Sequence, residues 1–416
     1  MKMGNLVRRV RTYQWDDGDH RWLWLLAVNS MIYMASAAFS PYLTLYYKQN
    51  GISSLEIGTL MAVGPVVSIC IQPLWGVFSD LTGRRKLTLA IVVLGTAATV
   101  LGYRFGSGFG FFLVMAILLA SFNTSIVPLS DALTLEYANR HSINYARIRI
   151  GGTVGYSIVV LAVGGFLKED PGMAFLLGAA GYVLLFFLVL KIPVEGSSVR
   201  HRQKQKKAEA SDPGKKKGKI FYDNSYLFVM VCAFVMQVGM NFNSNFMGVY
   251  IGEMGYDQGL IGVANFVSAA SEIPILLAAG WIMKRFSSIQ ILLFSCVMMS
   301  VRIFLLTGES VGFVVASQLL QSVTYMTMYY SCVMFISRNT YPDKRSQGQS
   351  MLAMVQGGFA SVAGSMLGGV VTEQLGSRGA YWLMAAAVMA MTAAVAAAYR
   401  FYRKKQQPAA RSGAAG

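Results

Sequence analysis

Four ionisable residues stand inside long apolar stretches of this sequence. Asp131, Arg149, Glu272 and Arg302 have mostly apolar neighbours, and Glu272 lies in the middle of NFVSAASEIPILLAAGWIM, residues 265–283. An isolated charge is costly in hydrocarbon, so such groups pair with one another or face water, and they are usually retained for function. Two acids and two bases predict two ion pairs that serve proton movement or solute binding.

The elements that carry these charges are expected to be transmembrane helices. The chain has 416 residues, 55% of them hydrophobic and 13% charged, about half the charge content of a soluble protein. Apolar blocks of roughly 20 residues have the length of a membrane-spanning helix and lack the alternation of barrel strands. The predicted spans are residues 22–46, 55–79, 87–105, 110–137, 148–167, 173–191, 225–250, 259–283, 288–307, 311–337, 347–372 and 379–401.

The basic residues predict how these twelve spans are oriented. An even number of spans places both termini on one side. Of 36 Lys and Arg, the loops on the opposite side contain only Lys48, Arg104, Lys168 and Arg378. Because basic residues favour the cytoplasmic side, we expect a multi-pass protein of the cell membrane with both termini cytoplasmic. The basic run KKKGK at 215–219 fits such a cytoplasmic linker, and binding of anionic lipid is its alternative interpretation.

The polar segment 192–224 divides the chain into two halves. We expect a first six-helix bundle at 1–191, a cytoplasmic linker at 192–224, a second bundle at 225–402 and a cytoplasmic tail at 403–416. The linker is basic and poor in apolar residues, a composition typical of disorder.

The two halves also align with each other. The segment LYYKQNGISSLEIG (45–58) matches VYIGEMGYDQGLIG (249–262) at a constant offset of 204 residues, which brings Gly58 onto Gly262. The fold class predicted is therefore an all-α integral membrane protein with twelve transmembrane helices in two six-helix pseudo-repeats. Parallel repeats of this kind place a solute path between the halves, near the bilayer midplane.

Several other functional classes lack support in the sequence. The net charge of +17 could indicate nucleic-acid binding, but the basic residues lie at helix ends and in alternate loops. The four cysteines lie far apart in apolar blocks, which predicts neither a metal site nor a disulfide framework. The sequence contains no phosphate-binding G-x-x-x-x-G-K-[ST] loop and no Ser/His/Asp constellation. We therefore expect no enzyme activity, no cofactor, no metal and no nucleic-acid partner.

The loop GVFSDLTGRRK, residues 76–86, resembles the signature loop of the major facilitator superfamily. Glycine at its start would allow close helix approach, the aspartate could pair with a cation or a helix N-terminus, and the second glycine would allow a tight turn. The resemblance implies the major facilitator fold and a latch between conformational states formed by Gly76, Asp80, Gly83, Arg84 and Arg85. The equivalent loop at 280–288 keeps the glycine and the basic pair but has no aspartate.

The segment 128–156 resembles the span four to span five region of the lactose, phenylpropionate and nucleoside permease branch of that superfamily. In lactose permease the matching acid and arginine engage the sugar, next to an aromatic platform. The resemblance implies solute binding by Asp131, Arg149 and Tyr156. Arg149 could instead extend to the cytosolic membrane surface, since it lies at the start of its span.

Glu272 and Arg302 match the acid of span eight and the arginine of span nine in the same branch. Related permeases carry a histidine in span ten, but residues 311–337 contain neither histidine nor carboxylate. A proton carrier would therefore be Glu272 or Asp131. In the favoured hypothesis Glu272 alternates between a protonated state and a state paired with Arg302. The alternative is a fixed ion pair that only sets helix packing.

A polar stripe in span seven adds further candidates. Gln237, Asn241 and Asn245 recur every four residues and so share one helix face. They could form a cavity wall that binds solute, or hydrogen bonds between helices. With Gln321 of span ten, Asn241 and Asn245 complete the predicted solute-binding set.

The combined expectation is a secondary active transporter that imports a small polar organic solute together with protons. A sugar, a nucleoside or an aromatic acid would suit such a site, and we expect a monomer in contact with membrane lipid. The alternatives are a proton-driven efflux antiporter of drugs or metabolites, and a transport-inactive sensor or scaffold. A sensor would need an added cytosolic domain or a long tail, and the sequence offers neither.

Overall fold

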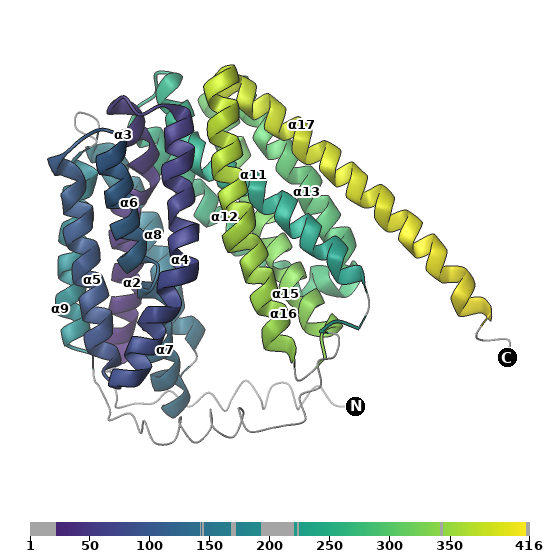
Figure 1. Ribbon diagram of the computed structural model, residues 1–416, viewed down its shortest axis with the longest axis horizontal. Helices are drawn as coiled ribbons and strands as arrows, with labels where there is room; N and C mark the ends of the chain where they lie inside the picture. The colour runs from purple at the N-terminus through teal and green to yellow at the C-terminus, as the bar shows by residue number, and fades with distance from the viewer. Residues whose placement is uncertain are drawn as a thin grey trace.

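The computed structural model describes residues 22–141, 143, 145–167, 172–192, 220–222, 224–341 and 344–412, and over these residues the protein is helical (Figure 1). The helices of the first part are α2 (Trp22–Phe39), α3 (Leu43–Gln49), α4 (Ser54–Thr82), α5 (Arg85–Gly102), α6 (Phe109–Asn123), α7 (Ile126–Arg140), α8 (Tyr145–Phe166) and α9 (Met173–Leu190). Short 3₁₀ turns η1 (Ser40–Tyr42) and η2 (Tyr103–Phe105) follow α2 and α5.

The second part contains α11 (Ser225–Glu253), α12 (Gln258–Arg285), α13 (Ser288–Leu305), α14 (Val311–Leu319), α15 (Thr327–Asn339), α16 (Arg345–Ala353) and α17 (Ala360–Ser412). A 3₁₀ turn, η3 (Leu306–Gly308), follows α13. Two short π-helical segments, η4 (Ser322–Met326) and η6 (Met354–Phe359), join α14 to α15 and α16 to α17. Within the described residues the strand-like pairing is an isolated bridge between Phe221 and Thr340.

Membrane-spanning character is strong across the described residues, where nine helices are long and apolar enough to cross a bilayer. Such helices are favoured in lipid because each satisfies its own backbone hydrogen bonds. The predicted spans 259–283 and 311–337 are helical as well, the latter as α14, η4 and α15. The last two predicted spans are two helices that share the label α17 and meet at Gly376, where the backbone (φ 69°, ψ 168°) is not helical.

Local sequence signals explain where the long helices begin and end. Ser53 and Ser287 each form a capping box with a residue three positions on, and these boxes start α4 and α13. Gly83 ends α4 in the left-handed conformation (φ 63°), as predicted for a tight turn. Gly51 and Gly255, which the sequence alignment of the halves brings together, both have positive φ, 78° and 80°.

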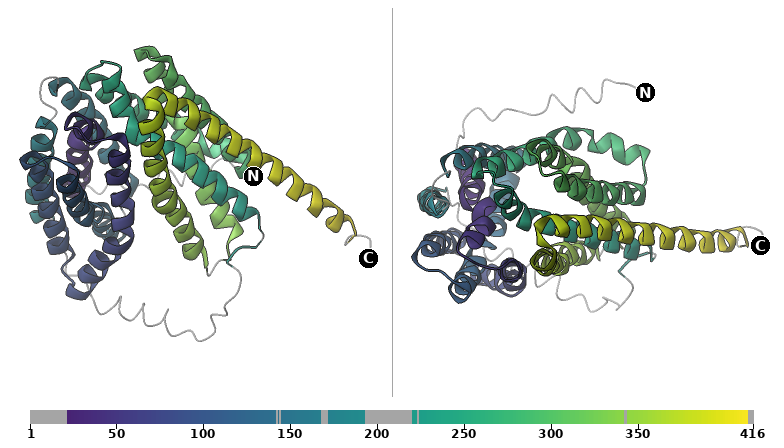
Figure 2. Two further views of the ribbon diagram at one scale, coloured as in Figure 1. Left: turned by 45° about the horizontal axis from the view of Figure 1, so that its top comes forward. Right: turned by 90° about the horizontal axis from the view of Figure 1, so that it is seen from above.

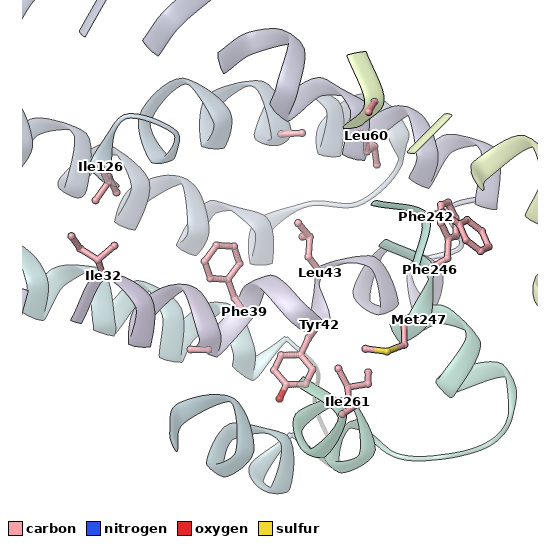
Figure 3. Close-up of a cluster of buried hydrophobic side chains, with 14 of the residues drawn as sticks. Ile32, Phe39, Tyr42, Leu43, Leu60, Ile126, Phe242, Phe246, Met247 and Ile261 are labelled. Atoms are coloured by element: carbon pink, nitrogen blue, oxygen red, sulfur yellow. The ribbon is translucent and has the colours of Figure 1, made fainter. Parts of the chain in front are cut away.

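Helices α2 to α9 pack mainly with one another, and α11 to α17 do the same (Figures 1 and 2). The main contacts between the two groups are α4 with α17, α8 with α12, and α3 with α11. Figure 3 shows where the core is continuous between the groups, with Tyr42 beside Met247 and Ile261. The Tyr42 hydroxyl donates to the Val160 carbonyl oxygen of α8 at 2.9 Å. This arrangement places α2, α4, α8, α11 and α12 around a shared interior.

Candidate functional site

A cavity of about 340 Å³ lies between the two groups of helices. Its lining comes from α2, η1, α3, α4 and α8 on one side and from α11, α12, α13, α14 and Gln321 on the other. Its charged lining residues are Arg149, Glu272 and Arg302. Three of the four ionisable residues that the sequence singled out therefore share one cavity. The predicted residues Tyr156, Asn245 and Gln321 also line it.

Arg302 is held almost completely out of solvent at the end of α13. Its side chain is 2% exposed. Nη2 donates to Gln318 Oε1 at 2.7 Å, and Nη1 donates to Gln321 Oε1. Nη1 also lies 3.4 Å from Thr324 Oγ1. Because the guanidinium carries only donors, two amide oxygens suit a buried arginine to which the described residues supply no direct acidic partner.

Gln321 connects Arg302 to Glu272. Its Oε1 accepts from the arginine, while its Nε2 donates to Glu272 Oε1 at 3.1 Å. The predicted direct ion pair is thus replaced by an amide bridge in this structure. The physical reason is position: Gln321 stands between the two side chains, and its amide has one acceptor end and one donor end. The three residues form what we term the Arg302–Gln321–Glu272 bridge.

Arg149 reaches the same cavity from α8. Its guanidinium carbon lies 4.2 Å from the centroid of the Tyr33 ring on α2, a cation–π arrangement. Gly152 makes room for this contact, since a Cβ built there would lie 2.5 Å from Tyr33 Cδ2 and 3.0 Å from Arg149 Nη1. Arg149 therefore lines the cavity in this conformation.

Two predicted solute-binding residues lie outside the cavity lining. Asp131 Oδ1 accepts a hydrogen bond from the Tyr145 hydroxyl at 2.8 Å. Asn241 Nδ2 donates to the Gln237 carbonyl oxygen at 2.8 Å, and its Oδ1 accepts from Ser361 Oγ of α17 at 3.0 Å. In this conformation both side chains are engaged by protein partners. For Asn241 this fits the interhelical interpretation of the polar stripe.

Asn245 combines both interpretations of that stripe. Its Nδ2 donates to Ser365 Oγ at 2.8 Å, and it also lines the cavity. Tyr33 and Asn265 are lining residues that the sequence analysis did not single out. Asn265 precedes Glu272 by two helical turns and so lies on the same face of α12, a signal that could have found it. Tyr33 carries no comparable signal, because a tyrosine in an apolar span is ordinary.

The latch motif forms a charged junction at the end of α4. Arg85 Nη2 lies 3.7 Å from Asp80 Oδ1, and Nη1 donates to Glu136 Oε2 of α7. A second cavity of about 210 Å³ borders Gly76, Asp80 and Arg85. A Cβ built on Gly76 would meet no atom within 4 Å, so the close helix contact predicted there is not made in this conformation.

Close backbone contacts instead occur near the other end of the helices, where α4 and α12 begin. A Cβ built on Gly58 would lie 2.6 Å from the Ser365 carbonyl oxygen and 2.9 Å from Gly369 Cα. A Cβ built on Gly262 would lie 2.6 Å from the Val160 carbonyl oxygen and 3.3 Å from Gly164 Cα. Glycine is therefore required where α4 meets α17 and where α12 meets α8.

Polar contacts join the two groups of helices at the same end. The Ser54 backbone N–H donates to Glu373 Oε2 at 2.8 Å, which satisfies one of the free donors at the start of α4. Lys48 Nζ lies 3.7 Å from Glu253 Oε1. The end of the molecule where α4 and α12 begin is thus closed by both backbone packing and charge.

Known proteins resemble this chain over most of its length. The chain is 26% identical to a maltose permease of Geobacillus stearothermophilus over 352 residues, which cover 83% of this chain and 86% of the permease. It is 21% identical to a probable 3-phenylpropionic acid transporter of Escherichia coli, with 87% of this chain and 94% of that protein covered. The crystal structure of the nucleoside transporter NupG superimposes with a TM-score of 0.75 at 16% identity, covering 92% of this chain and 99% of that one.

A family model settles the wider relationship. Residues 23–384 match the model described as the MFS_1 like family, which spans both groups of helices. The match includes the cavity residues Arg149, Glu272 and Arg302 and the latch motif at 76–86. The chain therefore belongs to the MFS_1 like family, and it is a membrane transporter of the major facilitator superfamily.

Proposed function

We propose that the protein imports a small polar organic solute together with protons, by alternating access. In this proposal twelve spans form two six-helix pseudo-repeats, 1–191 and 225–402, joined by a cytoplasmic linker at 192–224. The tail at 403–416 and the N-terminus are cytoplasmic. The protein acts as a monomer in the cell membrane.

The cavity between the two groups of helices is the observation that carries the proposal. It combines two arginines, one carboxylate, amides and two tyrosines in an interior between the helices. Charges of this kind are costly in lipid unless they work on an ion or a solute. Transporters built from repeats bind their solute at the interface of the repeats, which supports a solute site in this cavity.

The glycine contacts support alternating access. With cytoplasmic termini, the end where α4 and α12 begin faces outward, so the contacts Gly58–Gly369 and Gly164–Gly262 close the outer side. Gly58 and Gly262 are equivalent in the two aligned halves. Rocking of one bundle against the other would open both contacts together and expose the cavity to the outside.

Proton coupling is assigned to the Arg302–Gln321–Glu272 bridge. In the ionised state Glu272 accepts from Gln321, which also accepts from Arg302. Protonation of Glu272 would weaken this charge-assisted hydrogen bond and change how firmly α12 is held to α13 and to Gln321. Arg149, Tyr156, Asn245 and Gln321 are the proposed solute contacts. Asp131 and Asn241 would join them only in another conformation of the cycle.

Uptake into liposomes with an imposed inward proton gradient tests this function. The purified protein would be assayed with labelled maltose, uridine and 3-phenylpropionate. We expect gradient-driven accumulation of at least one class, lost on Glu272→Gln and kept on Glu309→Gln, which changes an exposed acid paired with Arg378. Undiminished accumulation by Glu272→Gln would rule out Glu272 as the proton carrier. Accumulation that does not depend on the proton gradient would rule out proton coupling.

The direction of transport separates import from the efflux alternative. Addition of a transported solute to cells should make the medium more alkaline if protons enter with it. Proton-driven extrusion of the same solute from preloaded vesicles would instead support an antiporter.

A further inference from the structure

The two arginines of the cavity differ in how their donors are engaged. Arg302 is 2% exposed, and its Nη atoms donate to Gln318 and Gln321. Arg149, by contrast, makes no ion pair with a carboxylate in the described part of the chain, and one face of its guanidinium lies on Tyr33. A stacked guanidinium keeps its N–H donors in the plane of the group, at its edge. Arg149 is therefore the cavity arginine that can bind a ligand.

The Arg149–Tyr33 stack is built into the packing of α8 against α2. A Cβ on Gly152 would lie within 3.0 Å of both side chains, so any other residue at this position would displace the stack. Tyr33 and Arg149 both line the cavity. The fork of donors is thus held by its neighbours instead of moving freely, which lowers the entropy cost of binding a ligand.

The charges that line the cavity leave an excess of positive charge. Arg149 and Arg302 contribute two cations, and Glu272 contributes one anion that is joined to Arg302 through Gln321. Asp131 is not among the lining residues, and its Oδ1 accepts a hydrogen bond from the Tyr145 hydroxyl. A neutral solute would leave Arg149 without an anionic partner. A carboxylate would match the guanidinium fork in both charge and shape.

We propose that the transported solute is a small monocarboxylate whose carboxylate binds Arg149. This inference rests on the proposed function, because it names the solute class for the same cavity. The body of the acid would lie beside Met61, Tyr156, Met240 and Met247. The rest of the lining is mostly polar and would bind polar groups on that body; it includes Ser40, Thr44, Thr153, Asn243, Asn245, Asn265 and Ser268. Methionine side chains adapt to ligands of different shape, so acids with aromatic or short aliphatic bodies would both be accepted. The cavity volume of about 340 Å³ suits a molecule of that size.

Matched pairs of ligands test the proposal on the purified full-length protein. The probes are 3-phenylpropionate, benzoate and hexanoate, each compared with its own primary amide, together with maltose and uridine. Binding would be measured by calorimetry and by thermal stabilisation. We expect at least one acid to bind about 10- to 100-fold more tightly than its amide, because the amide replaces one of two anionic acceptor oxygens by an NH2 donor and carries no charge.

Three substitutions on α8 test whether the carboxylate of the ligand binds Arg149. Arg149→Gln should remove the preference for acid over amide, and Arg149→Lys should keep only part of it because the fork is lost. Gly152→Ala should weaken acid binding by displacing the stack. Arg147→Gln is the matched control, since Arg147 is an exposed arginine of the same helix outside the cavity lining.

Each contrary outcome overturns this inference. It is wrong if amides bind as tightly as acids, if Arg149→Gln keeps the preference, if no acid of the panel binds, or if only maltose or uridine binds. The result also separates this inference from the proposed function. Proton-driven uptake of maltose or uridine would contradict the carboxylate inference and support the proposed function. Binding of an acid without proton-driven uptake would support the carboxylate inference and contradict the proposed function.

Discussion

The contact between α4 and α17 predicts that a single methyl group at Gly58 changes the conformational balance of the transporter. In the Gly58→Ala variant the new Cβ would lie 2.6 Å from the Ser365 carbonyl oxygen, whereas ordinary contacts begin at 3.4 Å. The two helices would therefore have to separate by about 0.8 Å at this point. Overpacking of this kind costs about 1–3 kcal/mol.

That cost falls on the state in which this end is closed, because the contact exists only there. A penalty of about 1–3 kcal/mol corresponds to a shift of roughly 5- to 150-fold in the balance between two states. Gly262→Ala should act in the same direction, since its Cβ would lie 2.6 Å from the Val160 carbonyl oxygen. The two sites lie in different helix pairs, so the double variant should show about the sum of both effects.

Spin labels at positions 49 and 254, at the ends of α3 and α11, would report the change as a distance distribution and leave the Lys48–Glu253 ion pair in place. We expect a short distance in the parent protein and a growing longer component in Gly58→Ala and in the double variant. Gly64→Ala is the matched control, because a Cβ at Gly64 on the same helix would meet no atom within 4 Å. If Gly58→Ala gave the same distribution as Gly64→Ala, the proposed closure would be wrong.

Three further predictions follow from the bridge, the latch and the turn after α4. Gln321→Leu should reduce proton-driven uptake about 10- to 100-fold, because it removes the hydrogen bonds to the charged groups of Glu272 and Arg302. Gln318→Leu should reduce uptake less, because it leaves the hydrogen bond between Gln321 and Glu272 in place. Equal losses of uptake in the two variants would contradict the bridge. Arg85→Gln should lower the maximal rate of uptake more than Arg84→Gln does, because Arg85 contacts both Asp80 and Glu136. The affinity for solute should stay the same. A loss of solute affinity with an unchanged maximal rate would contradict a latch. Gly83→Ala should lower the free energy of unfolding by about 1 kcal/mol, because Gly83 has φ 63°, a conformation that alanine disfavours. Gly165→Ala should not, because a Cβ at Gly165 would meet no atom within 4 Å. Equal midpoints of thermal unfolding for the two variants would contradict backbone strain at position 83.

The positions of the helices could be predicted because apolar length alone identifies a segment that spans a bilayer. That Arg149, Glu272 and Arg302 lie in one cavity could also be predicted, because charged side chains in membrane-spanning helices face the protein interior. The break between the last two predicted spans was also predicted, and it lies at Gly376, where the backbone is not helical.

The details of the site depended on contacts that no periodicity encodes. Tyr33 and Gly152 come from different helices, and only their packing turns Arg149 towards a ligand. Gln321 was predicted as a solute contact, but its place between Arg302 and Glu272 follows from side-chain geometry next to the π-helical segment η4. Asp131 and Asn241 suited a cavity wall by residue type, yet both are engaged by neighbouring groups.

Labelling of a cysteine placed in the cavity tests alternating access most directly. Ala269 lines the cavity, so Ala269→Cys would be made with Cys70, the exposed native cysteine, replaced by serine. A membrane-impermeant maleimide should label it in inside-out vesicles and not in right-side-out vesicles. With tryptophan at Gly58 and Gly262, labelling should also occur in right-side-out vesicles. Labelling from the outside without those tryptophans, or from neither side in any variant, would contradict a cavity that opens to each side in turn.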